Sequence, residues 1–67
     1  MEVFVFKTNI KYKYQIKELK NELDKLGKWN FDLEDCDKIL RIESCYNITF
    51  RVIKIFYTNN LQCEELL

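Results

Sequence analysis

The stretch EVFVFKT, residues 2–8, most constrains how this chain can fold. In an extended segment Val3 and Val5 lie on one side and Phe4 and Phe6 on the other, so both alternating sets are apolar. A strand that is apolar on both sides is typical of the interior of a sheet that is covered on both faces. We therefore predict that residues 2–8 form a central strand.

The next segment, residues 12–26, changes the apolar period from two residues to three and four. Such spacing places one apolar stripe on a helix, here opposite Lys and Glu. Gly27 follows where helices commonly end in the left-handed conformation, which glycine adopts without steric cost. The sequence predicts a helix that ends at Gly27, with a stripe made of Ile16, Leu19, Leu23 and Leu26.

A hairpin is predicted in the middle of the chain. From Lys28 the period returns to two, with polar residues between apolar ones, as in a half-exposed edge strand. DCDK, residues 35–38, favours a tight turn, and ILRIE, residues 39–43, continues as a second strand. The inward positions of the first strand are Trp29, Phe31 and Leu33, and the outward ones are Asn30, Asp32 and Glu34. We assign Trp29 and Phe31 to the core.

The segment NITFRVIKIFY, residues 47–57, is rich in β-branched and aromatic residues and alternates over its first five positions, which favours a strand. A helix is the better interpretation, because Asn47 can cap it and the Asn residues of TNNL tolerate the left-handed turn that ends it. Its apolar face would consist of Ile48, Val52, Ile55 and Phe56. LQCEELL, residues 61–67, is then a final short strand.

The element order β-α-β-β-α-β predicts an α+β fold, a ferredoxin-like sandwich with two helices on one face of a four-stranded antiparallel sheet. Residues 1–67 would form a single domain, because the chain is too short for two.

Composition excludes several function classes. Eleven basic residues balance eleven acidic ones, and residues 39–43 carry no aromatic side chain, so neither the charge nor the stacking platform of a nucleic-acid binder is present. No apolar run reaches the ~20 residues of a membrane span. Without His, and with every acidic residue on a predicted exposed face or turn, we predict no enzymatic activity. Three cysteines at wide spacing indicate free thiols in the cytoplasm.

The order and length of the elements, the glycine that closes the first helix and the NNLQC turn resemble the heavy-metal-associated (HMA) domain family. The resemblance implies a metal loop, M-x-C-x-x-C, between the first strand and the first helix. The two cysteines of that motif would fall near Asn9 and Tyr12 in this chain. An amide and a phenol cannot replace thiolate ligands for soft ions. We therefore predict a degenerate metal site and no bound cofactor.

A relocated thiolate site is the alternative. In the predicted topology Cys36, in the hairpin turn, and Cys63, after the last turn, lie at the same end of the sheet as this loop, whereas Cys45 lies at the opposite end. Such a pair could hold Cu(I) or Zn(II) in a chaperone-like protein. Against this, free cysteines mostly behave as small buried hydrophobic residues.

Contact with a partner protein, or with a second copy of the chain, is the predicted function. Two helices cover only one face of a sheet, so either Val3 and Val5 or Phe4 and Phe6 should face outward, together with Ile39. A central apolar patch on that open face is the candidate interaction surface. Flanking Lys, Arg and Tyr side chains that cover the patch are the alternative.

Overall fold

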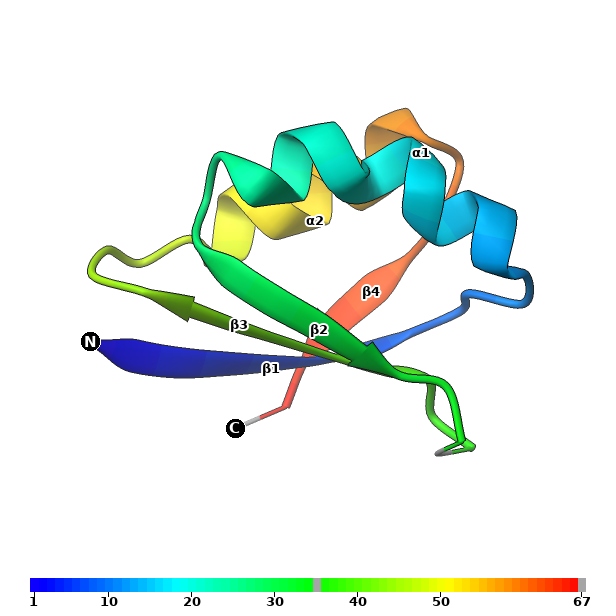
Figure 1. Cartoon of the computed structure of the whole chain (residues 1–67), viewed down its shortest axis with the longest axis horizontal. Helices are drawn as coiled ribbons and strands as arrows, with labels where there is room; N and C mark the ends of the chain where they lie inside the picture. Colours follow the sequence, from blue (N-terminus) through cyan, green and yellow to red (C-terminus); the bar gives the residue numbers. More distant parts are fainter. Residues whose placement is uncertain (35, 67) are drawn as a thin grey trace.

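The computed structural model describes residues 1–34 and 36–66 and contains six elements in the predicted order (Figure 1). They are β1 (Glu2–Thr8), α1 (Lys13–Asp24), β2 (Lys28–Asp32), β3 (Ile39–Ser44), α2 (Thr49–Thr58) and β4 (Cys63–Glu65). The helix predicted over the ambiguous last third is confirmed. Asp35 of the predicted turn and Leu67 of the predicted last strand lie outside the described residues.

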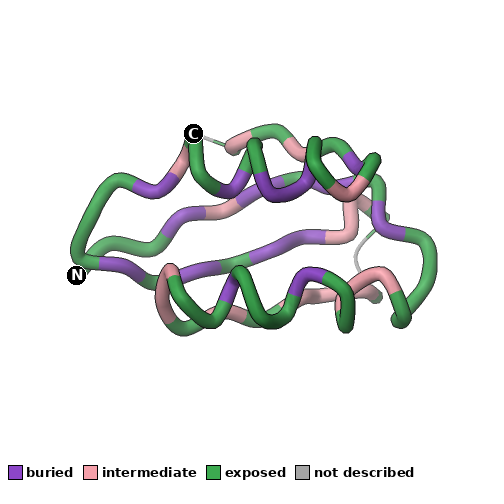
Figure 2. The backbone as a smooth tube through the Cα atoms, turned by 90° about the horizontal axis from the view of Figure 1, so that it is seen from above, coloured by how far each residue is buried: buried purple, intermediate pink, exposed green. Residues whose placement is uncertain are grey.

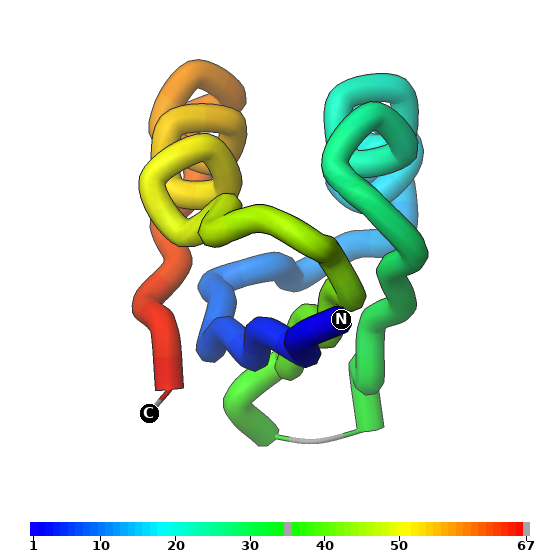
Figure 3. The backbone as a smooth tube through the Cα atoms, turned by 90° about the vertical axis from the view of Figure 1, so that its left-hand side faces the viewer, coloured from blue at the N-terminus to red at the C-terminus, as the bar shows by residue number. Residues whose placement is uncertain are grey.

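The four strands form one antiparallel sheet in the order β2-β3-β1-β4. The central position predicted for residues 2–8 and the edge position predicted for the strand after Lys28 are both confirmed. Both helices lie on the same face of the sheet, α2 above the edge formed by β4 and α1 above the edge formed by β2 (Figure 3). The chain is therefore an α+β structure with one covered and one open sheet face.

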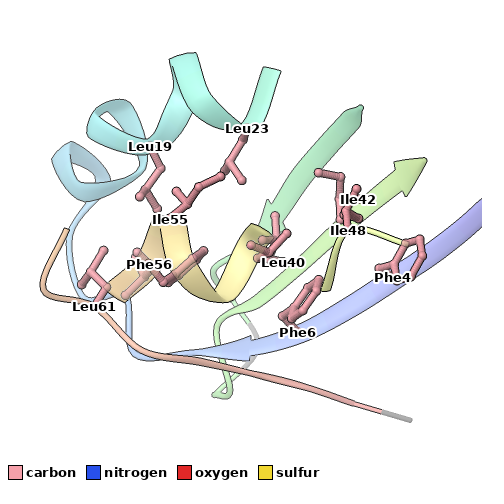
Figure 4. Packing of buried hydrophobic residues seen from close by; sticks show 12 residues of the cluster. Phe4, Phe6, Leu19, Leu23, Leu40, Ile42, Ile48, Ile55, Phe56 and Leu61 are labelled. Carbon is pink, nitrogen blue, oxygen red and sulfur yellow. The ribbon is translucent and has the colours of Figure 1, made fainter. Parts of the chain in front are cut away.

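The core lies between the helices and the covered face (Figure 4). Buried positions recur along the inner sides of the helices and alternate along the strands (Figure 2). Phe4 and Phe6 point into this core, where their cross-strand partners are Ile42 and Leu40. The helices contribute Leu19, Leu23, Val52, Ile55 and Phe56, and the predicted capping segment contributes Ile48. Trp29, Phe31 and Leu33 are half-buried against the cluster, so their predicted inward orientation is confirmed.

Gly27 follows α1 as predicted, but the predicted reason for a glycine there, a left-handed conformation, is wrong. No glycine of the described chain has a positive φ, and the residue that caps α1, Lys25, is right-handed. Instead, the chain between α1 and β2 passes against β3, and a Cβ atom added to Gly27 would lie 1.9 Å from the carbonyl oxygen of Glu43. Glycine is required here because only a residue without a side chain can approach that backbone so closely.

The C-terminal end of α2 agrees with the prediction, whereas the predicted cap, Asn47, lies one residue before the N-cap. The Thr49 N–H donates to Oδ1 of Asn47 at 3.1 Å, so Asn47 satisfies an amide of the first turn, although the formal N-cap is Ile48. Asn60 has a φ of 61°, the left-handed conformation that Asn tolerates. The Leu61 N–H then donates to the carbonyl of Phe56 at 2.8 Å. The helix therefore stops in a hydrogen-bonded turn that leads directly into β4.

Candidate functional site

Three loops meet at one end of the sheet, as the sequence predicts. The Thr8 N–H donates to the Asp37 carbonyl at 3.1 Å, and the Thr8 hydroxyl donates to the Lys38 carbonyl at 2.6 Å, which joins β1 to the β2–β3 turn. The Asn9 N–H donates to the Gln62 carbonyl at 3.2 Å, which joins the β1–α1 loop to the α2–β4 turn. This end corresponds to the metal-loop end of the predicted fold.

Asn9, at the first predicted ligand position, holds two of these loops together. Its side-chain Oδ1 accepts the N–H of Gln62 at 2.9 Å, while its own N–H donates to the carbonyl of the same residue. This reciprocal pair extends the pairing of β1 with β4 by one residue, with a side-chain amide in place of a backbone carbonyl. The asparagine therefore has a structural role at this position.

Tyr12, at the second predicted ligand position, is the N-cap residue of α1. The Gln15 side chain accepts the Tyr12 N–H at 2.9 Å and the Lys11 N–H at 2.8 Å, which satisfies two amides at the start of the helix. Tyr12 is 57% exposed, and its ring stacks on the ring of Tyr14, with 5.6 Å between the centroids. Its backbone, rather than its phenol, starts the helix.

The cysteines of the alternative site have different surroundings. Cys63 is half-buried and packs against the core cluster, and this burial raises the pKa of its thiol to about 11 by disfavouring the thiolate. Cys36 is exposed in the β2–β3 turn, and Cys45 is exposed at the opposite end of the sheet, after β3. Across residues 1–34 and 36–66 no group of three or more His, Cys, Asp or Glu side chains is placed to hold a metal ion. A metal bound at Cys63 would have to displace a tightly held proton.

The interaction surface predicted around β1 is much smaller than expected. Phe4 is 6% exposed and Phe6 is fully buried, because both face the helices. Ile39 does lie on the open side of β3, but it is only 5% exposed and thus inaccessible. Val3 is 57% exposed and Val5 is half-buried. Charged and polar neighbours surround Val3 in a shallow hollow formed with Lys28, Trp29, Asn30, Arg41 and Glu43. One exposed valine among these groups does not make an apolar patch.

A larger apolar surface lies on α2. Phe50 is 84% exposed, Tyr57 is 80% exposed and Ile53 is 37% exposed. We call these three residues the α2 stripe. Their spacing of three and four residues places them on one side of the helix. Ile53 borders the side that is buried in the core, whereas Phe50 and Tyr57 point away from it. The same periodicity that predicts the core side of α2 also indicates this second stripe, so the signal was present in the sequence.

The α2 stripe borders a hollow of about 360 Å³ between α2 and the β4 edge. Ile53 and Tyr57 form its α2 side, and Leu61, Cys63 and Glu64 form its β4 side. Lys7, Thr8 and Asn9, at the end of β1, close it. β4 is an edge strand of three residues, and no strand of the described chain lies beyond it. The apolar side chains of the α2 stripe therefore lie at a margin of the sheet.

Comparisons with known proteins identify no relative. No family model matches the chain, and neither a curated protein nor a solved structure gives a significant match. The resemblance to HMA domains therefore stays a prediction from the sequence. Neither helix in residues 1–34 and 36–66 is long and apolar enough to cross a membrane.

Proposed function

We propose that this chain is a non-enzymatic, ferredoxin-like domain that acts through protein contacts, similar in architecture to HMA domains but without their metal-binding cysteine pair. The observation that carries the proposal is the α2 stripe, an exposed apolar surface next to a hollow at the sheet edge. Catalysis and metal transport have weaker support, because the one half-buried thiol is held in its protonated form.

The strand order supports the ferredoxin-like assignment. From the β4 edge the order is β4-β1-β3-β2. Helix α1 connects β1 to β2, two parallel strands that are separated by β3, and α2 connects β3 to β4, which are separated by β1. Both connections pass over the same face (Figure 1). Two interleaved βαβ units of this kind define the split βαβ sandwich.

The size of the α2 stripe supports a protein contact. A buried aromatic side chain contributes roughly 150–250 Å² of contact area, so a partner that covered Phe50 and Tyr57 would remove several hundred Å² from water. The largest apolar patch of an ordinary monomer is about 300–600 Å² and is often functional. Aromatic side chains are also among those that dominate binding energy at interfaces, and Tyr57 lines the hollow itself. The partner we expect is a protein with an apolar segment that enters the hollow between α2 and β4.

Site-specific photo-crosslinking tests this contact. The photoreactive residue p-benzoylphenylalanine replaces Phe50, and in a matched control it replaces Lys17, which is exposed on α1. We expect adducts in cell extract from position 50 that excess wild-type domain suppresses and that a Phe50→Ser, Tyr57→Ser domain does not suppress. Both changes are at exposed positions, so circular dichroism should show an unchanged fold. Equal suppression by the two competitors would contradict the proposal.

The degenerate-loop part of the proposal has its own test. If the β1–α1 loop keeps the architecture of an HMA loop, Asn9→Cys, Tyr12→Cys should create a soft-ion site. We expect the reduced double variant to bind one Cu(I) and the wild type to bind none with sub-micromolar affinity. Tight binding by the wild type that disappears in a Cys36→Ser, Cys63→Ser variant would instead support the thiolate alternative. A folded Asn9→Cys, Tyr12→Cys variant that binds no Cu(I) would remove the HMA resemblance from the proposal.

A further inference from the structure

We propose that the chain forms a two-fold symmetric dimer in which β2 pairs antiparallel with β2 of a second copy, centred on Asn30. This contact lies at the edge of the sheet opposite the α2 stripe, so it is independent of the function proposed above. The proposal rests on the exposed backbone edge of β2, on its charge pattern and on its aromatic pattern.

Strand β2 offers an unpaired backbone edge. In the part of the chain that the structure describes, β2 is hydrogen-bonded to β3 on one side and has no strand on the other. Its five residues, KWNFD, are extended and contain no Pro or Gly. The opposite edge is less suitable, because β4 has only three residues and two of them are Glu. An exposed strand edge is a template for pairing with another strand unless charge or shape prevents it.

The charges of β2 select a second copy in one orientation. Lys28 and Asp32 lie at its two ends and on the same, open face of the sheet, since their cross-strand partners are Glu43 and Ile39. In an antiparallel pair centred on Asn30, each Lys28 lies directly opposite the Asp32 of the other copy. A parallel pair would place Lys28 opposite Lys28 and Asp32 opposite Asp32. Opposite charges in directly facing positions stabilise a strand pair, and like charges destabilise it.

Strand β3 continues the charge pattern on both sides of the seam. Lys28 lies opposite Glu43 within one copy, and Asp32 is 4.0 Å from the Arg41 guanidinium. Across the seam the order becomes Glu43, Lys28, then Asp32 of the second copy, with Arg41 of that copy diagonally next to it. Each charge in this row has a neighbour of opposite sign. The monomer surface therefore already carries half of a self-complementary charge row, as an isologous two-fold interface requires.

The other face of β2 supplies an aromatic row in the same register. Trp29 and Phe31 are both half-buried beneath α1 and form an edge-to-face pair, with 5.7 Å between their centroids. The Trp29 indole N–H donates to Oδ1 of Asp24 at 2.7 Å, which holds the ring in place. In the proposed dimer each Trp29 faces Phe31 of the other copy. Aromatic residues in facing positions are among the more favourable cross-strand pairs.

Such a dimer would join two sheets into one of eight strands, with all four helices on one face. Because β4 lies at the far edge of each copy, the two α2 stripes would remain accessible at opposite ends. The seam involves one strand and its flanks, which is smaller than the roughly 800 Å² per partner of a standard interface. We therefore expect a weak, concentration-dependent dimer.

Charge exchange between two variants tests the dimer. The weight-average molar mass of the wild type, measured by analytical ultracentrifugation, should rise with concentration from 8.2 kDa towards twice that value. Lys28→Glu and Asp32→Lys should each weaken dimerisation about tenfold, because each introduces two like-charge contacts per dimer.

An equimolar mixture of the two variants should dimerise again. In the mixed pair the introduced carboxylate at position 28 of one copy would face the introduced ammonium at position 32 of the other. The unchanged Asp32 of the first copy would face the unchanged Lys28 of the second, so both facing pairs would again have opposite charges. Glu64→Lys, on the opposite edge strand, is the control and should behave as the wild type.

Several outcomes would overturn the proposal. A wild type that stays at 8.2 kDa up to about 1 mM would exclude the dimer at any useful affinity. Dimerisation that persists in both single variants would locate the interface elsewhere. A Phe50→Ser, Tyr57→Ser protein that no longer dimerises would locate it on α2. Loss of the dimer in the single variants without recovery in the mixture would exclude the antiparallel register. Circular dichroism of each variant would separate these outcomes from unfolding.

Discussion

The two helices lie side by side on the same sheet face (Figure 3), yet they expose very different amounts of apolar surface. Helix α1 buries Leu19 and Leu23 and, apart from the half-exposed Tyr14, presents Lys, Glu, Asn and Asp to solvent. Helix α2 buries three apolar residues, contains no acidic residue and still exposes Phe50 and Tyr57 almost completely. A helix in a two-layer fold needs only one apolar face. α1 therefore has what folding requires, whereas α2 has an apolar surface that folding leaves unused.

Replacing the same residue type on the two sides of α2 is the strongest test of this comparison. Phe56 is fully buried and Phe50 is 84% exposed. Phe56→Ala should lower the free energy of unfolding by about 3–5 kcal/mol, because it removes a large buried ring and leaves a cavity. Phe50→Ala should change it by less than about 0.5 kcal/mol. Urea denaturation followed by circular dichroism measures both. A large loss from Phe50→Ala would mean that the α2 stripe serves the fold.

The ends of the two helices give the next test. The sequence predicts that Gly27, which follows α1, is needed for a left-handed cap. In the structure it is needed because the backbone passes close to Glu43. A left-handed cap tolerates Asn much better than Ala. Close approach tolerates neither, because both have a Cβ atom. We expect Gly27→Ala and Gly27→Asn to destabilise the protein equally, by about 1–3 kcal/mol. A clearly smaller loss for Gly27→Asn in urea denaturation would restore the left-handed interpretation.

The strand beneath α2 contains a half-buried thiol, whereas the strand beneath α1 contains no cysteine. Burial raises the pKa of the Cys63 thiol from 9.0 to about 11. The folded state therefore keeps this proton more tightly than the unfolded state. The resulting stability is fully present below pH 9 and is lost as the pH rises towards 11. Because the thiol is only half-buried, solvent screening reduces the loss below the full value of the shift, to an amount on the order of 1–2 kcal/mol. Chemical denaturation at several pH values should show this decline. Cys63→Ala is the control for every other source of pH dependence. Stability curves of the same shape for the two proteins would contradict the shift.

Much of the fold could be predicted from the sequence, because it depends on local periodicity. The core sides of both helices follow from their spacing, and the hairpin follows from the return to period two at Lys28. The covered side of β1 did not follow, since Val3 and Phe4 belong to sets that are both apolar. The pair formed by Asn9 and Gln62 joins residues 53 positions apart, so no local pattern indicates it. The candidate site was expected on the sheet because both sets of β1 are apolar, whereas the exposed apolar residues lie on α2.

The smallest effect is expected at the end of α2, where Asn60 adopts a φ of 61°. Asn tolerates this conformation, but Gly adopts it without any Cβ penalty. Asn60→Gly should therefore stabilise the protein, although greater freedom in the unfolded chain offsets part of the gain. We expect a net increase of up to about 0.5 kcal/mol in the free energy of unfolding.

Asn59→Gly is the matched control and should destabilise, because Asn59 has a negative φ and its side-chain amide donates to the Ile55 carbonyl at 2.8 Å. Opposite signs for these two neighbours, together with equal losses for both Gly27 variants, would show that the two helices end for different physical reasons. A loss of stability from Asn60→Gly would instead mean that its side chain contributes more to the turn than its backbone conformation costs.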